Sequence, residues 1–177
     1  MTTWIAFFRG INVGGNNLLP MAKLRVDLEQ LKLKNVRTYI QSGNVIFDSP
    51  IKTAATLAKK IAAQVETEHG FRPPVFVLKR DELQETIQSN PFPHAVADPK
   101  TLHVFFLGSQ PAKPNLPAIE AAKKPTEQYE LADRVFYLHA PDGIGRSKLA
   151  ANVEKYLGVV ATARNYRTID KLLLMVT

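Results

Sequence analysis

Two stretches of the 177-residue chain combine glycines with side chains that can bind anions. The first runs from Arg9 to Asn17 and contains three glycines and three asparagines. The second runs from Gly143 to Lys148 and reads G-I-G-R-S-K. Backbone N–H groups in such stretches, with basic side chains beside them, can surround a phosphate or a carboxylate. Both stretches are therefore candidates for contact with an anionic ligand.

In the first stretch, Gly14 and Gly15 would let a ligand approach the backbone, while Asn12 and Asn16 offer amide groups, with Arg9 before them. The stretch matches neither G-x-x-x-x-G-K-[ST] nor G-x-G-x-x-G, and no lysine follows the glycines directly. A tight turn, with asparagines in left-handed conformations or capping the next helix, explains the same residues. Both interpretations stay open.

A second polar segment, Q-S-G-N, lies at the tip of a predicted hairpin and ends at Asn44. Ser42 and Asn44 are its candidate ligand contacts. A hairpin needs glycine or asparagine at its turn, but it does not need all of these hydrogen-bonding groups. Ligand contact and ordinary turn chemistry explain this segment equally well.

The stretch around Arg146, Ser147 and Lys148 is the stronger anion candidate, because two cations and a hydroxyl follow two glycines at a predicted helix start. The alternative is that Ser147 caps the helix and the basic side chains are solvated. Capping does not require cations in a first turn, where the helix dipole disfavours them, so we expect phosphate or carboxylate contact. Arg164 and Arg167, with Asn165 between them, supply a second basic edge, although one of these arginines could instead pair with Asp142 or Asp170.

Other chemistry has little support in the sequence. The chain has no cysteine, which excludes disulfides and thiolate catalysis. The four histidines show no metal-ligand spacing; His103 and His139 lie on adjacent predicted strands and could meet, but without the carboxylates that a metal site needs. No serine lies in a nucleophile elbow and no paired carboxylates stand out. We therefore predict no metal and no cofactor, assign no catalytic residue, and leave open whether the protein is an enzyme.

The elements that must position these residues follow the order strand, helix, strand, strand, helix, strand, twice. The first set is predicted at residues 4–8, 21–33, 36–41, 45–47, 57–70 and 74–78. A connecting helix at 81–89 precedes the second set, which is predicted at residues 101–107, 118–123, a hairpin within 129–138, 147–156 and 159–162, with a last helix at 166–175. Trp4, Phe8, Phe47 and Phe76 are expected in the core, because apolar residues fill both faces of their strands.

This order predicts an α+β protein of two tandem ferredoxin-like α/β plaits. The predicted domains are residues 1–80, a connecting segment 81–98, and residues 99–177 with the terminal helix. In a plait the first two strands run in the same direction, so the loop after strand 1 and the turn after strand 2 leave the same end of the sheet. In the second plait the loop 141–148 shares an end with segment 163–168 in the same way. We expect the polar segments to line one composite cleft between the subdomains.

Composition places the chain among globular proteins, with 45% hydrophobic and 22% charged residues. No apolar run reaches the length of a membrane span and the N-terminus does not read as a signal peptide, so a cytoplasmic location without a membrane partner is expected. The formal charge of +7 and the isoelectric point near 9.7 favour anionic partners, although solvated lysines explain them as well.

Five sequence blocks resemble those of one bacterial family, catalogued as domain of unknown function 1697. The blocks are R-G-I-N-V-G-G-N-N…P-M, T-Y-I-Q-S-G-N-V-I-F, N-P-F, G-R-S-K-L and T-A-R-N-Y-R-T, and they cover nearly the whole chain in the same order. The resemblance implies two plait-like subdomains and no particular activity. Many members have tryptophan where this chain has Tyr166. The matching positions are Arg9, Asn12, Gly14, Gly15, Arg37, Thr38, Ser42, Gly43, Asn44, Arg146, Ser147, Lys148, Arg164, Asn165 and Thr168.

The leading functional hypothesis is a protein that binds a phosphate-bearing or otherwise anionic small molecule, with a nucleotide as one option. Two alternatives use the same residues. A nucleic-acid-binding module would place the basic groups along a phosphate backbone. A non-catalytic structural or interaction protein would use the motifs to hold its parts together. A monomer is the favoured oligomeric state.

Overall fold

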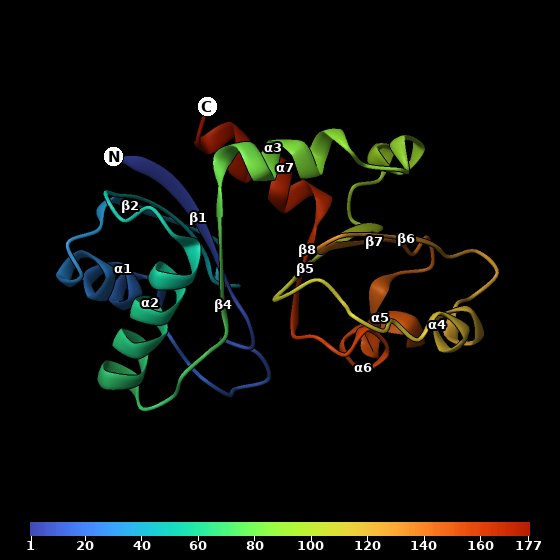
Figure 1. Ribbon diagram of the computed structural model, residues 1–177, viewed down its shortest axis with the longest axis horizontal. Helices are drawn as coiled ribbons and strands as arrows, with labels where there is room; N and C mark the ends of the chain where they lie inside the picture. The colour runs from blue at the N-terminus through green and yellow to red at the C-terminus, as the bar shows by residue number, and fades with distance from the viewer. The chain divides into compact units, whose positions relative to one another are not determined.

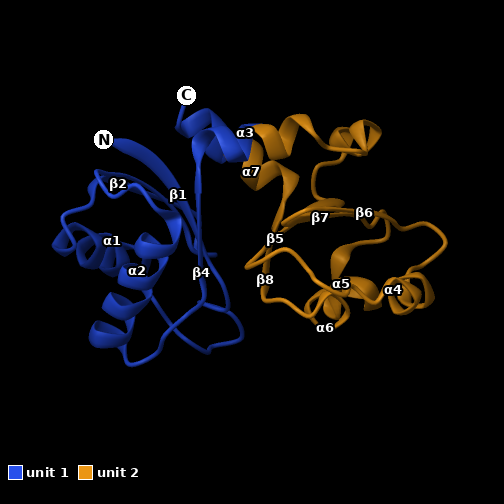
Figure 2. Cartoon of the chain, in the orientation of Figure 1, with its two compact units in different colours: residues 1–84, 172–177 blue, residues 85–171 orange.

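The computed structural model describes residues 1–177 and is an α+β fold with two four-stranded antiparallel sheets and seven α-helices (Figure 1). The chain forms two compact units (Figure 2). Unit 1 comprises residues 1–84 and 172–177, and unit 2 comprises residues 85–171.

The first sheet has the strand order β2-β3-β1-β4, and every neighbouring pair is antiparallel. Its strands and the helices between them are β1 (Thr2–Phe8), α1 (Met21–Gln30), β2 (Lys34–Tyr39), β3 (Asn44–Ser49), α2 (Ala54–His69) and β4 (Val75–Lys79). The helix α3 (Arg80–Gln88) follows directly. The alternation of strand and helix that the apolar spacing predicts is therefore present in this unit.

The core of unit 1 forms around β1, which is buried on both faces from Trp4 to Phe8. The helices α1 and α2 cover the face that carries Trp4, Ala6 and Phe8, with Leu24 and Leu28 among the residues packed there. Phe47 and Phe76 are also buried, so the predicted core position of all four aromatic rings is confirmed.

The second sheet has the order β6-β7-β5-β8, again with antiparallel neighbours throughout. Unit 2 contains η1 (Pro93–Ala97), β5 (Leu102–Leu107), α4 (Leu116–Ala122), β6 (Gln128–Ala132), β7 (Val135–His139), η2 (Ile144–Arg146), α5 (Lys148–Ala151), α6 (Val153–Leu157), β8 (Ala161–Asn165) and the first residues of α7 (Tyr166–Met175). The helices α4, α5 and α6 cover the face of the sheet that carries Phe105, Phe136 and Leu138.

Two elements of unit 2 differ from the sequence-based prediction. The single helix expected at 147–156 is two short helices, because the backbone of Asn152 leaves the helical region (φ −123°) and its side chain donates to the Lys148 carbonyl at 2.8 Å. The last strand lies at Ala161–Asn165 rather than at 159–162, since Gly158 ends α6 in a left-handed conformation (φ 71°) and the following residues must first reach β5.

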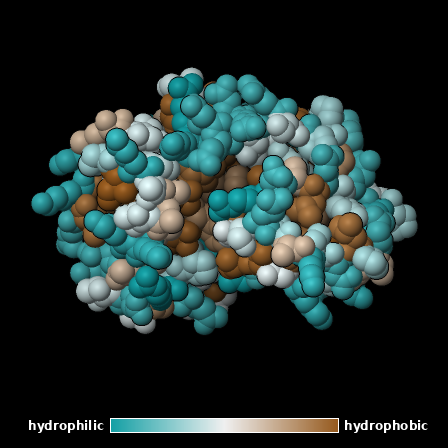
Figure 3. Space-filling view, viewed as in Figure 1, coloured by the Kyte–Doolittle hydropathy of each residue, from teal (hydrophilic) through white to brown (hydrophobic).

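Hydrophilic residues cover most of the surface in view, with hydrophobic residues in smaller patches between them (Figure 3). No helix combines the length and the apolar composition that crossing a bilayer requires.

Candidate functional site

The glycine-rich loop after β1 folds back on itself as a small hairpin. The Asn16 N–H donates to the Val13 carbonyl at 3.0 Å, and Gly14 and Gly15 have φ angles of 57° and 77°. These angles are those of a type I′ turn, which needs left-handed backbone at both central positions. The helix α1 begins only at Met21, so the glycines occupy the tip of a turn and do not open the helix as the anion-binding interpretation requires.

The side chain of Asn12 connects this loop to the turn after β2. Its Nδ2 donates to the Leu19 and Gln41 carbonyls, both at 2.9 Å, and its Oδ1 accepts from the Leu19 N–H at 2.7 Å. The sequence-based expectation that these two polar segments lie together is therefore confirmed. With three of its four hydrogen-bonding positions in use, the Asn12 amide holds the loop in place.

The Q-S-G-N turn packs tightly onto the end of β1. Asn44 is fully buried and donates to the Tyr39 carbonyl at 3.0 Å and to Ser42 Oγ at 2.9 Å. The Gly43 carbonyl accepts from the Phe8 N–H at 2.9 Å. These bonds describe the ordinary turn chemistry that the sequence allowed as an alternative. Of the predicted contacts in unit 1, Arg9, Gly14, Gly15, Asn16 and Ser42 are exposed.

In unit 2, the loop after β7 is anchored by Ser147. This residue is 3% exposed, and its Oγ accepts from the Ala150 N–H at 3.0 Å, which makes it the N-cap of α5. Capping by Ser147 was one of the two interpretations left open by the sequence. The backbone of Gly143 and Gly145 is unobstructed, since a β-carbon at either position would meet no atom within 4 Å.

The basic side chains on either side of Ser147 remain available. Arg146 and Lys148 are exposed, and neither side chain makes a hydrogen bond or an ion pair within the chain. Asp142, the acidic residue closest in sequence, accepts instead from the Thr126 hydroxyl at 2.7 Å. Two uncompensated positive charges thus lie close together in sequence, beside open glycine backbone.

Arg164 lies within β8, and not in the segment after it as the sequence-based assignment had it. It pairs with Val104 of β5, while its neighbour Ala163 pairs with Phe105 on the face that α4, α5 and α6 cover. The alternation of side chains along a strand therefore directs Arg164 to the opposite face. The guanidinium donates to Thr162 Oγ1 and to the Ala163 carbonyl, both at 2.8 Å, and burial lowers its pKa to about 10.

The expected convergence in unit 2 is thus only partly present. The strands β7 and β8 both run antiparallel to β5. The loop after β7 and the last residues of β8 therefore lie at the same end of the sheet, as predicted. However, Leu149 of α5 packs on the helix-covered face, whereas Arg164 points to the other one. Asn165 accepts from the Thr168 N–H at 2.9 Å and so caps α7. Neither Arg164 nor Asn165 therefore resembles a flexible ligand contact.

The histidines do not form the pair that the strand assignment permitted. His139 lies opposite Leu102 and His103 lies opposite Leu138, so the two histidines project from opposite faces of the sheet. The ring of His139 instead lies 5.2 Å from that of His94, between centroids. No group of three or more histidine, aspartate or glutamate side chains is close enough to hold a metal ion.

Two polar arrangements in unit 1 were missed by the sequence analysis. His69 Nε2 donates to the Asp27 carboxylate at 2.7 Å, beside a recess of about 480 Å³. The sequence carries no signal for this pair, because the two residues lie 42 positions apart on separate helices.

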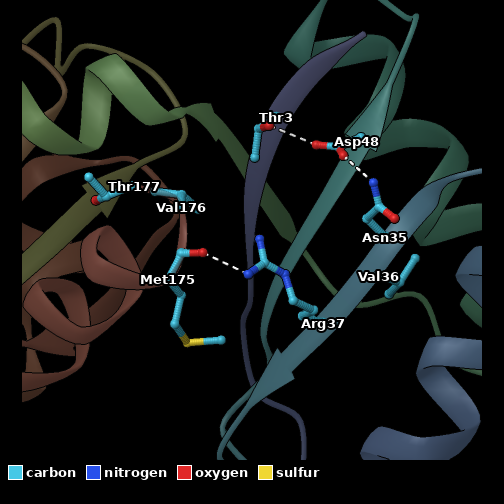
Figure 4. A pocket seen from close by; sticks show the side chains of 8 residues that line it. All are labelled: Thr3, Asn35, Val36, Arg37, Asp48, Met175, Val176 and Thr177. Carbon is cyan, nitrogen blue, oxygen red and sulfur yellow. Dashed lines mark hydrogen bonds between the residues drawn. The ribbon is translucent and has the colours of Figure 1, made fainter.

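The second arrangement lines a recess of about 500 Å³ on the first sheet (Figure 4). Arg37 donates to the Met175 carbonyl at 2.7 Å. Asp48 accepts from Asn35 and Thr3, both at 2.7 Å, and these bonds hold the pKa of the Asp48 carboxyl below its usual value. The polar groups in view therefore bind one another, which favours a structural role for this recess.

Comparisons with known proteins concern the fold and the family of the chain. The chain is similar in structure to a conserved bacterial protein, SP0830 from Streptococcus pneumoniae, with a TM-score of 0.77 and 25% sequence identity over 99% of both chains. No curated protein gives a significant match. The family model described as "Protein of unknown function (DUF1697)" matches residues 1–137, which is more than three quarters of the sequence. The chain therefore belongs to the DUF1697 family.

Proposed function

We propose that the protein binds a phosphate-bearing or otherwise anionic small molecule, and that Arg146 and Lys148 supply the positive charge. The observation that carries this proposal is the absence of any partner for these two exposed cations within the chain. Ser147 between them is fixed as a helix cap, so the backbone that carries both side chains is held in one conformation. Arg and Lys side chains donate strong, charge-assisted hydrogen bonds to phosphate oxygens.

Backbone geometry supports the same site. Gly143 and Gly145 leave space beside the main chain for a ligand. The Gly143 N–H already donates to the Ala140 carbonyl at 3.0 Å, so of the two glycines only Gly145 could offer its N–H. The helix α5 has four residues, and the proposal therefore rests on the cations and not on a helix dipole. A nucleotide or a phosphorylated metabolite is the ligand class that this chemistry fits. No catalytic role is proposed.

The other predicted contacts take different roles in this proposal. Asn12 and Asn44 hold the loops of unit 1 together, and Arg164 belongs to the interior of unit 2. Arg9 and Asn16, which are exposed, stay candidate contacts. The composite cleft between the subdomains also stays a prediction, as does the cytoplasmic location. The strand orders β2-β3-β1-β4 and β6-β7-β5-β8 support the proposal that each unit is a ferredoxin-like plait.

Isothermal titration calorimetry with nucleotides, phosphorylated sugars and their uncharged parent compounds tests this function. We expect binding of at least one phosphorylated compound and none of its uncharged parent. Because a hydrogen bond to a charged group contributes about 1.5–3 kcal/mol, Arg146→Ala and Lys148→Ala should each weaken binding about tenfold to a hundredfold. Lys113→Ala is the matched control, since Lys113 is an exposed lysine of the same unit without a side-chain partner.

Salt dependence separates this function from the nucleic-acid alternative. A small ligand held by two cations gives a shallow decrease of affinity with salt, whereas a nucleic acid that spans many phosphate contacts gives a steep one. Binding of single-stranded or double-stranded nucleic acid with a steep slope, and no binding of small phosphates, would replace the proposal. An affinity equally reduced in Lys113→Ala and Arg146→Ala would also count against this site.

A further inference from the structure

The strand β6 is an edge strand of the second sheet, with β7 as its only neighbour. An edge strand presents backbone N–H and C=O groups that can pair with another extended chain. Natural proteins usually block such edges with charges, prolines or a covering loop. A recess of about 600 Å³ is lined by residues 128–131 of β6, so this part of the edge strand borders open space.

The hydrogen bonds of β7 show which backbone groups of β6 point outward. The Arg134 carbonyl accepts from the Leu107 N–H of β5 at 2.9 Å, and the Ala140 N–H donates to the carbonyl of Thr101, the residue before β5, at 2.8 Å. Even-numbered positions of β7 therefore face β5, and odd-numbered positions face β6. Because the bonding direction alternates along a strand, their partners on β6 face β7, and the N–H and C=O groups of Tyr129 and Leu131 point away from the sheet.

Apolar side chains line one side of this open edge. Tyr129 and Leu131 are partly buried against the core of unit 2, on the face that the helices cover. Leu116, at the start of α4, lines the same recess and is 45% exposed. A strand added to β6 would place alternate side chains against these three residues, where apolar groups would be removed from water.

The charges in the recess are mainly negative. Glu120, Glu127 and Glu130 contribute carboxylates, against a single lysine. That lysine, Lys123, donates its ammonium group to the backbone carbonyl of Glu127 at 3.2 Å, and the Glu120 carboxylate accepts from the Tyr129 hydroxyl at 2.6 Å. Glu130 is exposed and makes no hydrogen bond or ion pair through its side chain. In a chain with a formal charge of +7, this recess therefore favours a basic occupant.

The position of Glu130 disfavours a second copy of the chain. In a two-fold symmetric antiparallel pairing of β6 with itself, bonds between Tyr129 and Leu131 of the two copies would place Glu130 directly opposite Glu130. Like charges directly opposite each other destabilise a strand pair. In a partner protein of different sequence, a lysine or an arginine could lie opposite Glu130 and pair with its carboxylate.

We propose that β6 is a docking edge for an extended segment of a partner protein with an apolar–basic–apolar core. The segment adds to the sheet as a fifth strand, through the outward backbone groups of Tyr129 and Leu131. Its basic residue pairs with Glu130, and the flanking apolar residues pack against Tyr129, Leu131 and Leu116. This surface is independent of Arg146 and Lys148, so the proposal does not rest on anion binding.

Short synthetic peptides test this docking edge directly. The test peptide carries a Val-Lys-Val core, and two matched controls carry a Val-Glu-Val core or the same Val-Lys-Val core with N-methylated backbone amides. Amide hydrogen exchange of the full chain, followed by NMR, should show slower exchange at Tyr129 and Leu131 with the test peptide only. Fluorescence anisotropy should show at least about a tenfold weaker affinity for each control.

A charge reversal gives a second, independent measurement. Glu130→Lys should exchange the preference, so that the Val-Glu-Val peptide binds more tightly than the Val-Lys-Val peptide. Glu29→Lys, an exposed glutamate of α1 in unit 1, is the control and should keep the wild-type preference. Unchanged exchange at Tyr129 and Leu131 with every peptide would overturn the proposal. So would equal affinity for all three peptides, or concentration-dependent self-association that protects these two amides.

Discussion

His69, the last residue of α2, donates from Nε2 to the carboxylate of Asp27 on α1 at 2.7 Å. Asp27 is only 6% exposed, so this bond satisfies a carboxylate that would otherwise be buried without a partner. It joins the two helices that cover the core of unit 1.

We therefore predict that His69→Leu lowers the free energy of unfolding by about 1–3 kcal/mol, the cost of leaving a buried polar group unsatisfied. Urea denaturation followed by circular dichroism measures this change. Glu68→Leu, one residue earlier on the same helix and exposed, should change stability by less than about 0.5 kcal/mol. Equal effects of the two substitutions would show that the bond to Asp27 contributes nothing.

Gly43 lies in the turn after β2, and Gly70, which ends α2, is its matched control. Both have left-handed backbone, with φ angles of 80° and 79°. A β-carbon at Gly43 would lie 2.7 Å from Phe8 Cβ, whereas one at Gly70 would meet no atom within 4 Å. Gly70→Ala should cost about 1 kcal/mol for the backbone conformation alone, and Gly43→Ala at least about 2 kcal/mol more for the steric overlap.

Thermal denaturation of the two variants measures that difference. A similar melting temperature for both would mean that the turn can move away from Phe8, and that the close contact does not constrain it.

The buried His103 predicts a loss of stability in mild acid. Burial lowers the pKa of this imidazole from 6.5 to about 4, so the folded protein holds it neutral where the unfolded chain protonates it. The unfolded state then binds more protons between these two values. The free energy of unfolding therefore falls as the pH decreases from 6.5 through about 4, by about 3 kcal/mol over the whole window.

Urea denaturation at intervals across this window tests the prediction. In His103→Leu the free energy of unfolding should decrease less than in the wild type. A part of the decrease should remain, because burial and the neighbouring His94 also lower the pKa of His139. Identical pH profiles for the variant and the wild type would contradict the assignment.

Arg164 and Arg146 should respond differently to substitution. Arg164 is 8% exposed and donates to Thr162 Oγ1, whereas Arg146 is exposed and without a partner. We expect Arg164→Met to lower the melting temperature clearly and Arg146→Ala to leave it within about 1–2 °C, since isolated surface substitutions change stability by less than about 0.5 kcal/mol. The reverse order would show that Arg164 is not a structural residue.

The sequence predicted the α+β class and the order of helices and strands, because apolar periodicity depends on the same burial that builds the core. The spacing of Leu24 and Leu28 on α1, or the apolar run of β1, identifies elements whose packing the structure confirms. Topology then placed the loop after β1 beside the turn after β2, which the bonds of Asn12 confirm. These features follow from local sequence and general rules of chain connection.

The site was harder to predict, because the direction of one side chain depends on strand boundaries and register. A shift of the last strand from 159–162 to 161–165 moves Arg164 from a loop into the sheet and fixes the face to which it points. The bond between Asp27 and His69 depends on how two helices pack, and spacing along the chain does not encode it. The side chains of Asn12 and Asn44 bond to backbone groups. An asparagine can bond to a turn or to a ligand, so its residue type alone does not distinguish the two roles.

Two-dimensional ¹H–¹⁵N NMR with added inorganic pyrophosphate tests the central claim, anion binding at Arg146 and Lys148, most directly. We predict saturable shifts of the amide signals of residues 143–148, which disappear in the Arg146→Ala/Lys148→Ala double variant and persist in Lys113→Ala. An absence of shifts at residues 143–148, or shifts that are unchanged in the double variant, would contradict the claim.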